Sequence, residues 1–253
     1  MIYDMQRASF LKRIPAWLLD IILLMTLATG LMAGLSYVLD VDTHSENLDA
    51  VYVKYEEKYG IDFAKTEADF TSMTEEELAL YEEAAAELSK DAEAQKAFEM
   101  VMNLTLLTLS LGTLGAFLIL EFLIPLWLRN GQTLGKKVFG IALMRKDGIK
   151  VTPFMMFART VLGKYTLETM IPVLLFMMSF FGFLGLEGML IVGVILLLQV
   201  AITFATRNKT AIHDILACTV AVDLSSQMIF NSTEEQLEYH KQIHEENAAQ
   251  ADY

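Results

Sequence analysis

The chain has 253 residues, of which 54% are hydrophobic and 20% are charged, and its formal net charge is −13. This apolar content excludes an intrinsically disordered chain, and 14 glycines are too few for a collagen-like one. The single cysteine, Cys218, excludes a disulfide scaffold. The apolar residues come in long blocks, which indicates a protein with several membrane spans.

Four stretches are long and apolar enough to cross a bilayer, which takes about 20 residues. They lie at residues 14–38, 101–128, 165–186 and 188–206. The first stretch is too long for the apolar region of a typical signal peptide, and three more follow it, so we interpret it as an anchor. The sequence therefore predicts an all-α polytopic membrane protein with four transmembrane helices.

Lysine and arginine residues flank the four stretches in a pattern that predicts their orientation. They gather before the first stretch, between the second and the third, and after the fourth, where Arg207 and Lys209 stand. With four spans, all three regions fall on one side of the membrane. Because cytoplasmic loops carry an excess of positive charge, we expect both termini to be cytoplasmic. The expected location is the plasma membrane, a bacterial cytoplasmic membrane, with the lipid bilayer as the immediate partner.

The whole acidic imbalance lies in residues 40–99, which hold 18 Asp or Glu residues and 5 Lys residues. On the predicted topology this segment is extracytoplasmic. Its helical periodicity, together with a capping box formed by Thr74 and Glu77, predicts an acidic helical hairpin. Like charges exclude a nucleic acid partner. The segment is a solvated cap, a vestibule that attracts cations, or a docking surface for a protein partner.

These features divide the chain into four parts. They are the cytoplasmic N-terminus with the first span (1–39), the acidic insertion (40–99), spans two to four with the basic loop (100–232), and an acidic cytoplasmic tail (233–253).

The basic loop and the region after span four predict a small cytoplasmic β element. Asp147-Gly148 is a strong turn signal between short apolar runs at 137–143 and 149–151, which predicts a hairpin. Residues 219–222 form a further strand that can join it. Thr152 followed by Pro153 predicts the start of a separate amphipathic helix at the membrane interface.

Three carboxylates lie within the predicted spans, namely Asp20, Glu121 and Glu168, all in the inner half of the bilayer. A charged group at the centre of a span costs about 2.5–3.5 kcal/mol on insertion scales, so it needs a partner, water or a proton. Two interpretations stay open. The three acids bind Na⁺ or relay protons, or they form structural ion pairs with basic residues. The basic residues available for such pairs are Arg13, Arg159 and Lys164.

No catalytic constellation is evident in the sequence. Residues 131–136 (GQTLGK) carry two glycines, but a phosphate-binding loop needs four residues between them. The chain has no HExxH, no CxxC and no serine–histidine–acid spacing. We therefore expect no enzyme activity, no metal site and no cofactor.

Three stretches together resemble the RDD family of membrane proteins. They are Arg13 with Asp20 in the first span, residues 130–148 (NGQTLGKKVFGIALMRKDG) and residues 207–222 (RNKTAIHDILACTVAV). That family is named for one Arg and two Asp residues, and the matching positions here are Arg13, Asp20 and Asp214. The resemblance implies transport of unknown ligands. Sodium–proton antiport is associated with some members, whereas a eukaryotic relative is an assembly factor in protein quality control.

Two functions from different classes follow from these observations. The first is a cation or proton transporter in which intramembrane carboxylates bind the ion, the arginine sets the local potential and the last aspartate gates the cytoplasmic side. The residues assigned to it are Arg13, Asp20, Glu121, Glu168 and Asp214. Four spans leave little room for alternating access unless the chain forms a homo-oligomer, and this favours the second function. The alternative is a non-transporting scaffold that binds a partner through residues 40–99, an insertion that departs from the short first loop usual in the family.

Overall fold

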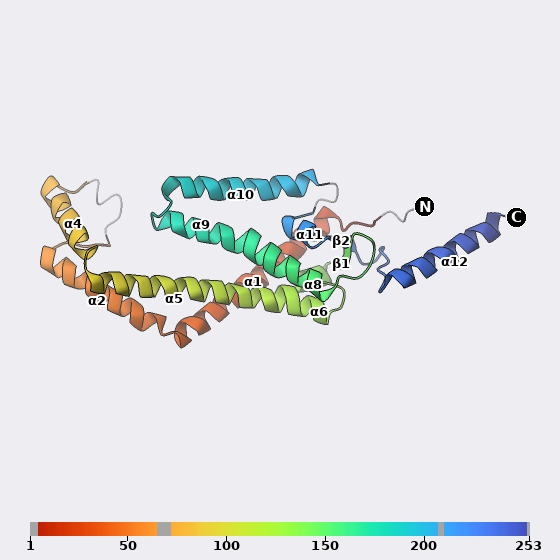
Figure 1. Ribbon diagram of the computed structural model, residues 1–253, viewed down its shortest axis with the longest axis horizontal. Coiled ribbons are helices and arrows are strands. Elements are labelled where there is room, and N and C mark those ends of the chain that lie inside the picture. The colour runs from red at the N-terminus through yellow and green to blue at the C-terminus, as the bar shows by residue number, and fades with distance from the viewer. Residues whose placement is uncertain (1–4, 65–71, 207–209, 252–253) are drawn as a thin grey trace. The chain divides into compact units, whose positions relative to one another are not determined.

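The computed structural model describes residues 5–64, 72–206 and 210–251. Arg207 and Lys209, on which the predicted orientation partly rests, lie outside these ranges. The described chain is mostly helical and contains one two-stranded sheet (Figure 1). This confirms the predicted helical class and the small β element.

Four helices of the described chain are long and apolar enough to cross a membrane. The first is α1 (Phe10–Val38) and the fourth is α10 (Gly185–Ala205). The second runs through α5 (Ala92–Phe117), the π-helical segment η1 (Leu118–Leu123) and α6 (Ile124–Trp127). The third runs through α8 (Pro153–Phe157), the π-helical segment η2 (Ala158–Met170) and α9 (Ile171–Phe180). Most side chains of these helices are not buried by the protein itself, as expected of helices surrounded by lipid.

The third span begins earlier than the sequence predicted. Thr152 caps it by accepting a hydrogen bond from the Met155 N–H at 3.3 Å, and Pro153 occupies the first turn. The helix then continues to Phe180, so the prediction of a separate interfacial helix is wrong. Polar residues in its first half lower the hydropathy of this segment, so the sequence placed the start of the span too late. The structure accommodates these residues because they point into the protein rather than toward lipid.

The chain forms two compact units, residues 29–112 and residues 1–28 with 113–253. In the first unit, α2 (Val41–Tyr59) contacts α4 (Glu75–Leu88). Gly60 ends α2 with a φ of 68°, a left-handed conformation that glycine adopts without strain. The predicted capping box is present, since the Glu77 carboxylate accepts the Thr74 N–H at 2.9 Å while the Thr74 hydroxyl accepts the Glu77 N–H.

Polar and aromatic contacts join α2 to the α4 region. Lys58 Nζ lies 2.7 Å from Glu87 Oε1, and the Tyr55 hydroxyl donates to Asp91 at 2.8 Å. The Phe63 ring packs edge-on against both Tyr52 and Tyr81. A partly exposed ion pair such as Lys58–Glu87 adds little to stability. The aromatic contacts therefore contribute more to the stability of this unit.

The sheet lies in the second unit. Strand β1 (Ile141–Arg145) pairs antiparallel with β2 (Thr219–Asp223). Because side chains alternate across a strand, Ile141 and Leu143 pack with Ala16 of α1 and Met156 of α8. The opposite face is a second buried cluster formed by Ala142, Met144, Val220 and Val222. The sheet is therefore buried on both faces and attaches the loops to the ends of two spans.

The pairing within the sheet differs from the predicted hairpin. Residues 149–151 contribute isolated bridges rather than a strand, Met144–Lys150 and Ile149–Phe230. The residues just before β1 form the short helix α7 (Leu134–Val138) instead of the start of a strand. Strand β2 pairs with β1 along its whole length and residues 219–222 are all buried, whereas only Ile149 of residues 149–151 is buried. Two further helices complete this unit, α11 (Ile212–Leu216) and α12 (Thr233–Ala251).

Gly112 of α5 allows α1 and α5 to approach closely. A Cβ at this position would lie 3.1 Å from the Met32 backbone nitrogen and would collide with the Met32 side chain. We expect Gly112→Ala to lower the free energy of unfolding by about 1–3 kcal/mol through overpacking. Gly34→Ala is the matched control, since a Cβ there meets no described atom within 4 Å. It should be neutral or stabilise by up to about 1 kcal/mol through helix propensity. Thermal unfolding in detergent would measure both, and equal effects would contradict this account of Gly112.

Candidate functional site

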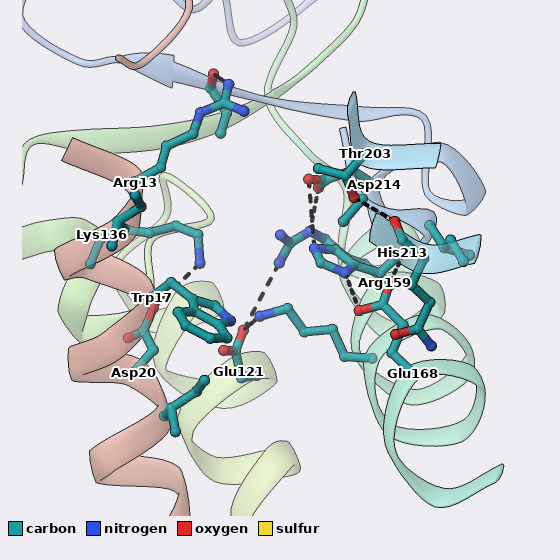
Figure 2. A pocket seen from close by; sticks show the side chains of 18 of the residues that line it. Arg13, Trp17, Asp20, Glu121, Lys136, Arg159, Glu168, Thr203, His213 and Asp214 are labelled. Carbon is teal, nitrogen blue, oxygen red and sulfur yellow. Dashed lines mark hydrogen bonds and ion pairs between the residues drawn. The ribbon is translucent and has the colours of Figure 1, made fainter. Parts of the chain in front are cut away.

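A cavity of about 700 Å³ lies in the unit formed by residues 1–28 and 113–253. All four spans contribute to its walls, together with α7, α11 and the strand β2. Its acidic lining residues are Asp20, Glu121, Glu168 and Asp214, and its basic lining residues are Arg13, Lys136, Arg159 and Lys164. Figure 2 shows side chains of these two kinds reaching toward one another from different elements. The cavity thus gathers every residue that the sequence assigned to a site.

Asp20 of α1 anchors the short helix α7. Its carboxylate accepts hydrogen bonds from the Thr133 hydroxyl and, at 2.8 Å, from the Gly135 N–H. Lys136 Nζ lies 3.5 Å from the same carboxylate. A carboxylate at a helix N-terminus accepts hydrogen bonds from amides that have no partner within the helix. The positive end of the helix dipole also stabilises its negative charge. Gly135 permits this approach, because a Cβ there would collide with the Ala16 carbonyl oxygen and with Asp20.

Glu121 of η1 is paired with the third span. Its Oε2 lies 2.6 Å from Lys164 Nζ and 3.9 Å from Arg159 Nη1. The side chains of Glu121 and Arg159 are only 5% and 2% exposed, so little water screens their charges. The Thr160 hydroxyl also donates to the Glu121 carbonyl oxygen at 2.9 Å. These contacts hold the second span against the third.

Arg159 also holds α11, the helix that follows the fourth span. Its Nε donates to Asp214 Oδ1 at 2.8 Å, and the Thr219 hydroxyl donates to the same oxygen at 2.7 Å. In Figure 2 the Arg159 guanidinium lies between Asp214 and Glu121. One guanidinium therefore links the second span, the third span and α11.

Glu168, on the same span as Arg159, also contacts the short helix α11. Its carboxylate accepts the His213 N–H at 2.9 Å and lies 2.7 Å from His213 Nδ1. The second imidazole nitrogen, Nε2, is 3.6 Å from Asp214. Gly163 of η2 makes this docking possible, because a Cβ there would collide with the His213 Cα and Cβ atoms.

Arg13 holds the start of α1 to the sheet. Its Nη2 donates to the Ala221 carbonyl oxygen of β2 at 2.9 Å. Its neighbour Lys12 reaches the other end of the strand, with Nζ 2.6 Å from Asp223. Arg13 thus lines the cavity and also holds β2 against the start of α1.

The charged residues of the second and third spans that line the cavity lie in π-helical backbone. Glu121 lies within η1, and η2 contains Arg159, Lys164 and Glu168. Such segments are rare and frequently occur at functional sites. A wider turn changes which side chains share a face, so ordinary helical spacing could not have shown that these residues meet.

Each predicted acid has a basic or N–H partner, and some of these partners were missed. Arg159 and Lys164 are expected from the sequence as partners of the intramembrane acids, whereas no sequence pattern assigns Lys136 or His213 to an acid. Two signals could have indicated these partners. Thr133 is a helix N-cap residue three positions before Lys136, and His213 stands beside Asp214 in one motif. The three intramembrane acids line one cavity but are engaged by different groups.

The environment alters the proton affinity of two groups outside the spans. Burial, followed by repulsion from Lys164, lowers the pKa of Lys136 to about 8. Burial also lowers the pKa of His213 from its ordinary value, against the opposing effect of the Asp214 carboxylate. Both side chains therefore lose a proton more readily than they would in water.

Removing Asp20 should destabilise the protein strongly. Asp20→Ala leaves the Thr133 hydroxyl and the Gly135 N–H without their acceptor and Lys136 without its counter-charge. We expect a loss of about 3–5 kcal/mol in the free energy of unfolding, as for a broken buried pair. Asp147→Asn removes the charge from the exposed ion pair with Arg145 and should cost about 1 kcal/mol or less. Chemical unfolding in detergent would measure both, and similar losses would show that the Asp20 contacts contribute no more than a surface pair.

The pKa of Lys136 predicts a pH dependence of stability. Between pH 8 and about 10.4, the unfolded chain holds this proton while the folded chain has lost it, so folding becomes more favourable as the pH rises. Relative to Lys136→Met, the wild type should gain up to about 1.4 kcal/mol per pH unit in this window. Thermal unfolding from pH 7 to 10 would show the divergence. Lys137→Met, at the exposed next position, is the control, and parallel curves for wild type and Lys136→Met would refute the prediction.

Of three comparisons with known proteins, one gives a match. No curated protein and no solved structure matches the chain. The model of the RDD family matches residues 7–218, which include all four spans, the sheet strand β1 and every residue of the charge cluster. The match covers well over half of the 253 residues and confirms the resemblance seen in the sequence. The chain belongs to the RDD family.

Proposed function

We propose that this RDD-family protein is a membrane transporter that transfers protons through the charged cavity. The observation that carries the proposal is the gathering of four carboxylates with lysine, arginine and histidine side chains in one cavity among four spans. Ionisable groups within a membrane are costly, and they mark ion pathways and proton relays. A purely structural bundle has no need for so many of them around a shared space.

The contacts favour a proton over Na⁺ as the transferred ion. Glu121 already holds the Lys164 ammonium at 2.6 Å, and Asp20 already accepts hydrogen bonds from α7. A metal ion would have to displace these donors to reach the carboxylate oxygens. A proton needs no such displacement, because it can pass from an ammonium group to the carboxylate that it contacts.

Two further groups support exchange of protons near neutral pH. The pKa of Lys136 is lowered to about 8, and that of His213 is lowered from its ordinary value, in both cases chiefly by burial. Histidine is the side chain whose charge changes most readily in the physiological range. His213 contacts Glu168 and lies 3.6 Å from Asp214, so it stands between two acids of the cavity. In this proposal His213 passes protons between the cavity and the cytoplasmic side.

The proposed orientation follows from the charge of the loops. Lysine and arginine residues surround the end of the bundle that carries the sheet and α11, so we place this end, with both termini, in the cytoplasm. The acidic helices α2 and α4 are then extracytoplasmic. The plasma membrane is the proposed location.

Glu121→Gln should reduce proton flux by about a hundredfold or more, because the amide can neither hold nor release the proton. The measurement is the decay of an imposed pH gradient in proteoliposomes, followed with an enclosed pH-sensitive dye, with and without Na⁺. Glu187→Gln changes an exposed acid at the start of α10, outside the cavity, and should behave like the wild type. Unfolding curves would confirm that both variants are folded.

Equal flux in wild type and folded Glu121→Gln would contradict the proton pathway. Flux that requires Na⁺ would replace it with a cation exchange. The second candidate function, a membrane scaffold, is favoured by one observation, namely that each carboxylate of the cavity already has a partner and so can simply brace the bundle. Wild-type liposomes no leakier than empty ones would support the scaffold, with α2 and α4 as the surface for a protein partner.

A further inference from the structure

The cavity has an apolar flank that proton transfer does not use. This flank is lined by α1 and α10 through Trp17 and Val200, which are 59% and 55% exposed. Phe10 and Phe204, whose ring centroids lie 6.4 Å apart, line the cavity near the ends of the same two spans. Side chains exposed on membrane spans face acyl chains rather than water. The cavity therefore opens toward the lipid, and a ligand that enters by this route carries an apolar chain.

The charged end of the cavity lies at the depth of lipid head groups. Arg13 is in the first turn of the first span, and Arg159 is in the second turn of the third. Asp214 follows the last residue of the fourth span by only nine positions. Phosphate groups of a bilayer lie at the ends of its spans, just outside the hydrocarbon core. An amphiphile with its chains on the apolar flank would place its head group among these charges.

Two hydrogen-bond donors in the cavity lack an acceptor. Among the described residues, no atom accepts a hydrogen bond from Arg159 Nη1 or from Gln199 Nε2, although both atoms are buried. The Arg159 side chain is 2% exposed, and Nη1 stands 3.9 Å from the nearest carboxylate oxygen in an ion pair. A buried donor without an acceptor costs about 1–3 kcal/mol. Both residues line the cavity, so a ligand there can supply the missing oxygens.

The site has unused hydrogen-bond donors, so it can bind a ligand with acceptor oxygens rather than a cation. The carboxylates of Asp20, Glu168 and Asp214 already accept hydrogen bonds from the protein. Glu121 Oε2 is a buried acceptor without a hydrogen bond, but its charge is neutralised by Lys164 at 2.6 Å and Arg159 at 3.9 Å. Phosphate oxygens are strong acceptors, and guanidinium groups bind them well. The open apolar flank, the depth of the charges and the unused donors thus specify one kind of ligand.

We propose that the cavity binds one membrane phospholipid. Its phosphate accepts hydrogen bonds from Arg159 and Gln199, and its acyl chains lie along α1 and α10 past Trp17 and Val200. A volume of about 700 Å³ holds the head group and the first part of the chains, and the rest stays in the bilayer. The site uses the same cavity as the proposed proton pathway, but its occupancy does not depend on proton flux.

The test is lipid binding to the purified, delipidated full-length protein in detergent, measured by native mass spectrometry. Phosphatidylglycerol is compared with diacylglycerol of the same acyl chains, which lacks only the head-group phosphate, and with inorganic phosphate. Two variants alter the site without removing an ion pair: Gln199→Leu removes one donor, and Val200→Trp fills the apolar flank. Leu197→Trp is the matched control, since Leu197 is 71% exposed on α10 and is not among the residues that line the cavity.

We expect phosphatidylglycerol to bind at least about tenfold more tightly than diacylglycerol, and Gln199→Leu to lose about tenfold, the equivalent of one hydrogen bond. Val200→Trp should lose at least as much, while Leu197→Trp binds like the wild type. Equal affinity for the two lipids, or unchanged binding in both site variants, would overturn the proposal. Retention of inorganic phosphate without lipid would assign the donors to a free anion, and binding of none of the three probes would assign them to water. Because no gradient is applied, a failure of the proton pathway would leave this result unaffected.

Discussion

Ionised side chains inside an apolar helix bundle have to be neutralised, and this requirement organises the unit that contains the cavity. Arg159 is the centre of the network, because it is almost completely buried and meets both Glu121 and Asp214. Its loss would leave two buried carboxylates undercompensated, which is far more costly than the loss of a surface pair. One guanidinium group therefore contacts acids of the second span and of α11, while the Lys164–Glu121 and Glu168–His213 contacts reinforce the same three elements.

The same requirement explains how the short helices between the spans and after the fourth span are attached to the helix bundle. Helix α7 has only five residues, too few to be stable alone, yet Asp20 captures its N-terminal amide and hydroxyl groups. Helix α11 is equally short and is held by Arg159 and Glu168. Glycines at Gly135 and Gly163 remove the side chains that would otherwise keep these helices away. These short helices are therefore held by charge pairing together with the close backbone contacts that Gly135 and Gly163 allow.

The network also connects stability with the proposed activities. In the proposed pathway, a proton that passes from Lys164 to Glu121 neutralises both members of an ion pair that holds two spans together, so the transfer would weaken this contact. The unit of residues 29–112 is stabilised differently, by aromatic contacts and by more exposed pairs such as Lys58 with Glu87. Its acidic helices are suited to solvent, because their charged side chains are largely exposed.

The sequence by itself determined the number of spans, the positions of their acids and the family, because long apolar blocks and the local motifs around Asp20 and Asp214 are properties of neighbouring residues. It also determined the caps at Thr74 and Thr152, which depend on residues three positions apart. Tertiary structure alone decided which base meets which acid, since Lys136 and His213 reach their partners across more than 40 residues of chain. It likewise decided the π-helical turns and the pairing of β1 with β2, because these depend on competition between distant partners for the same buried space.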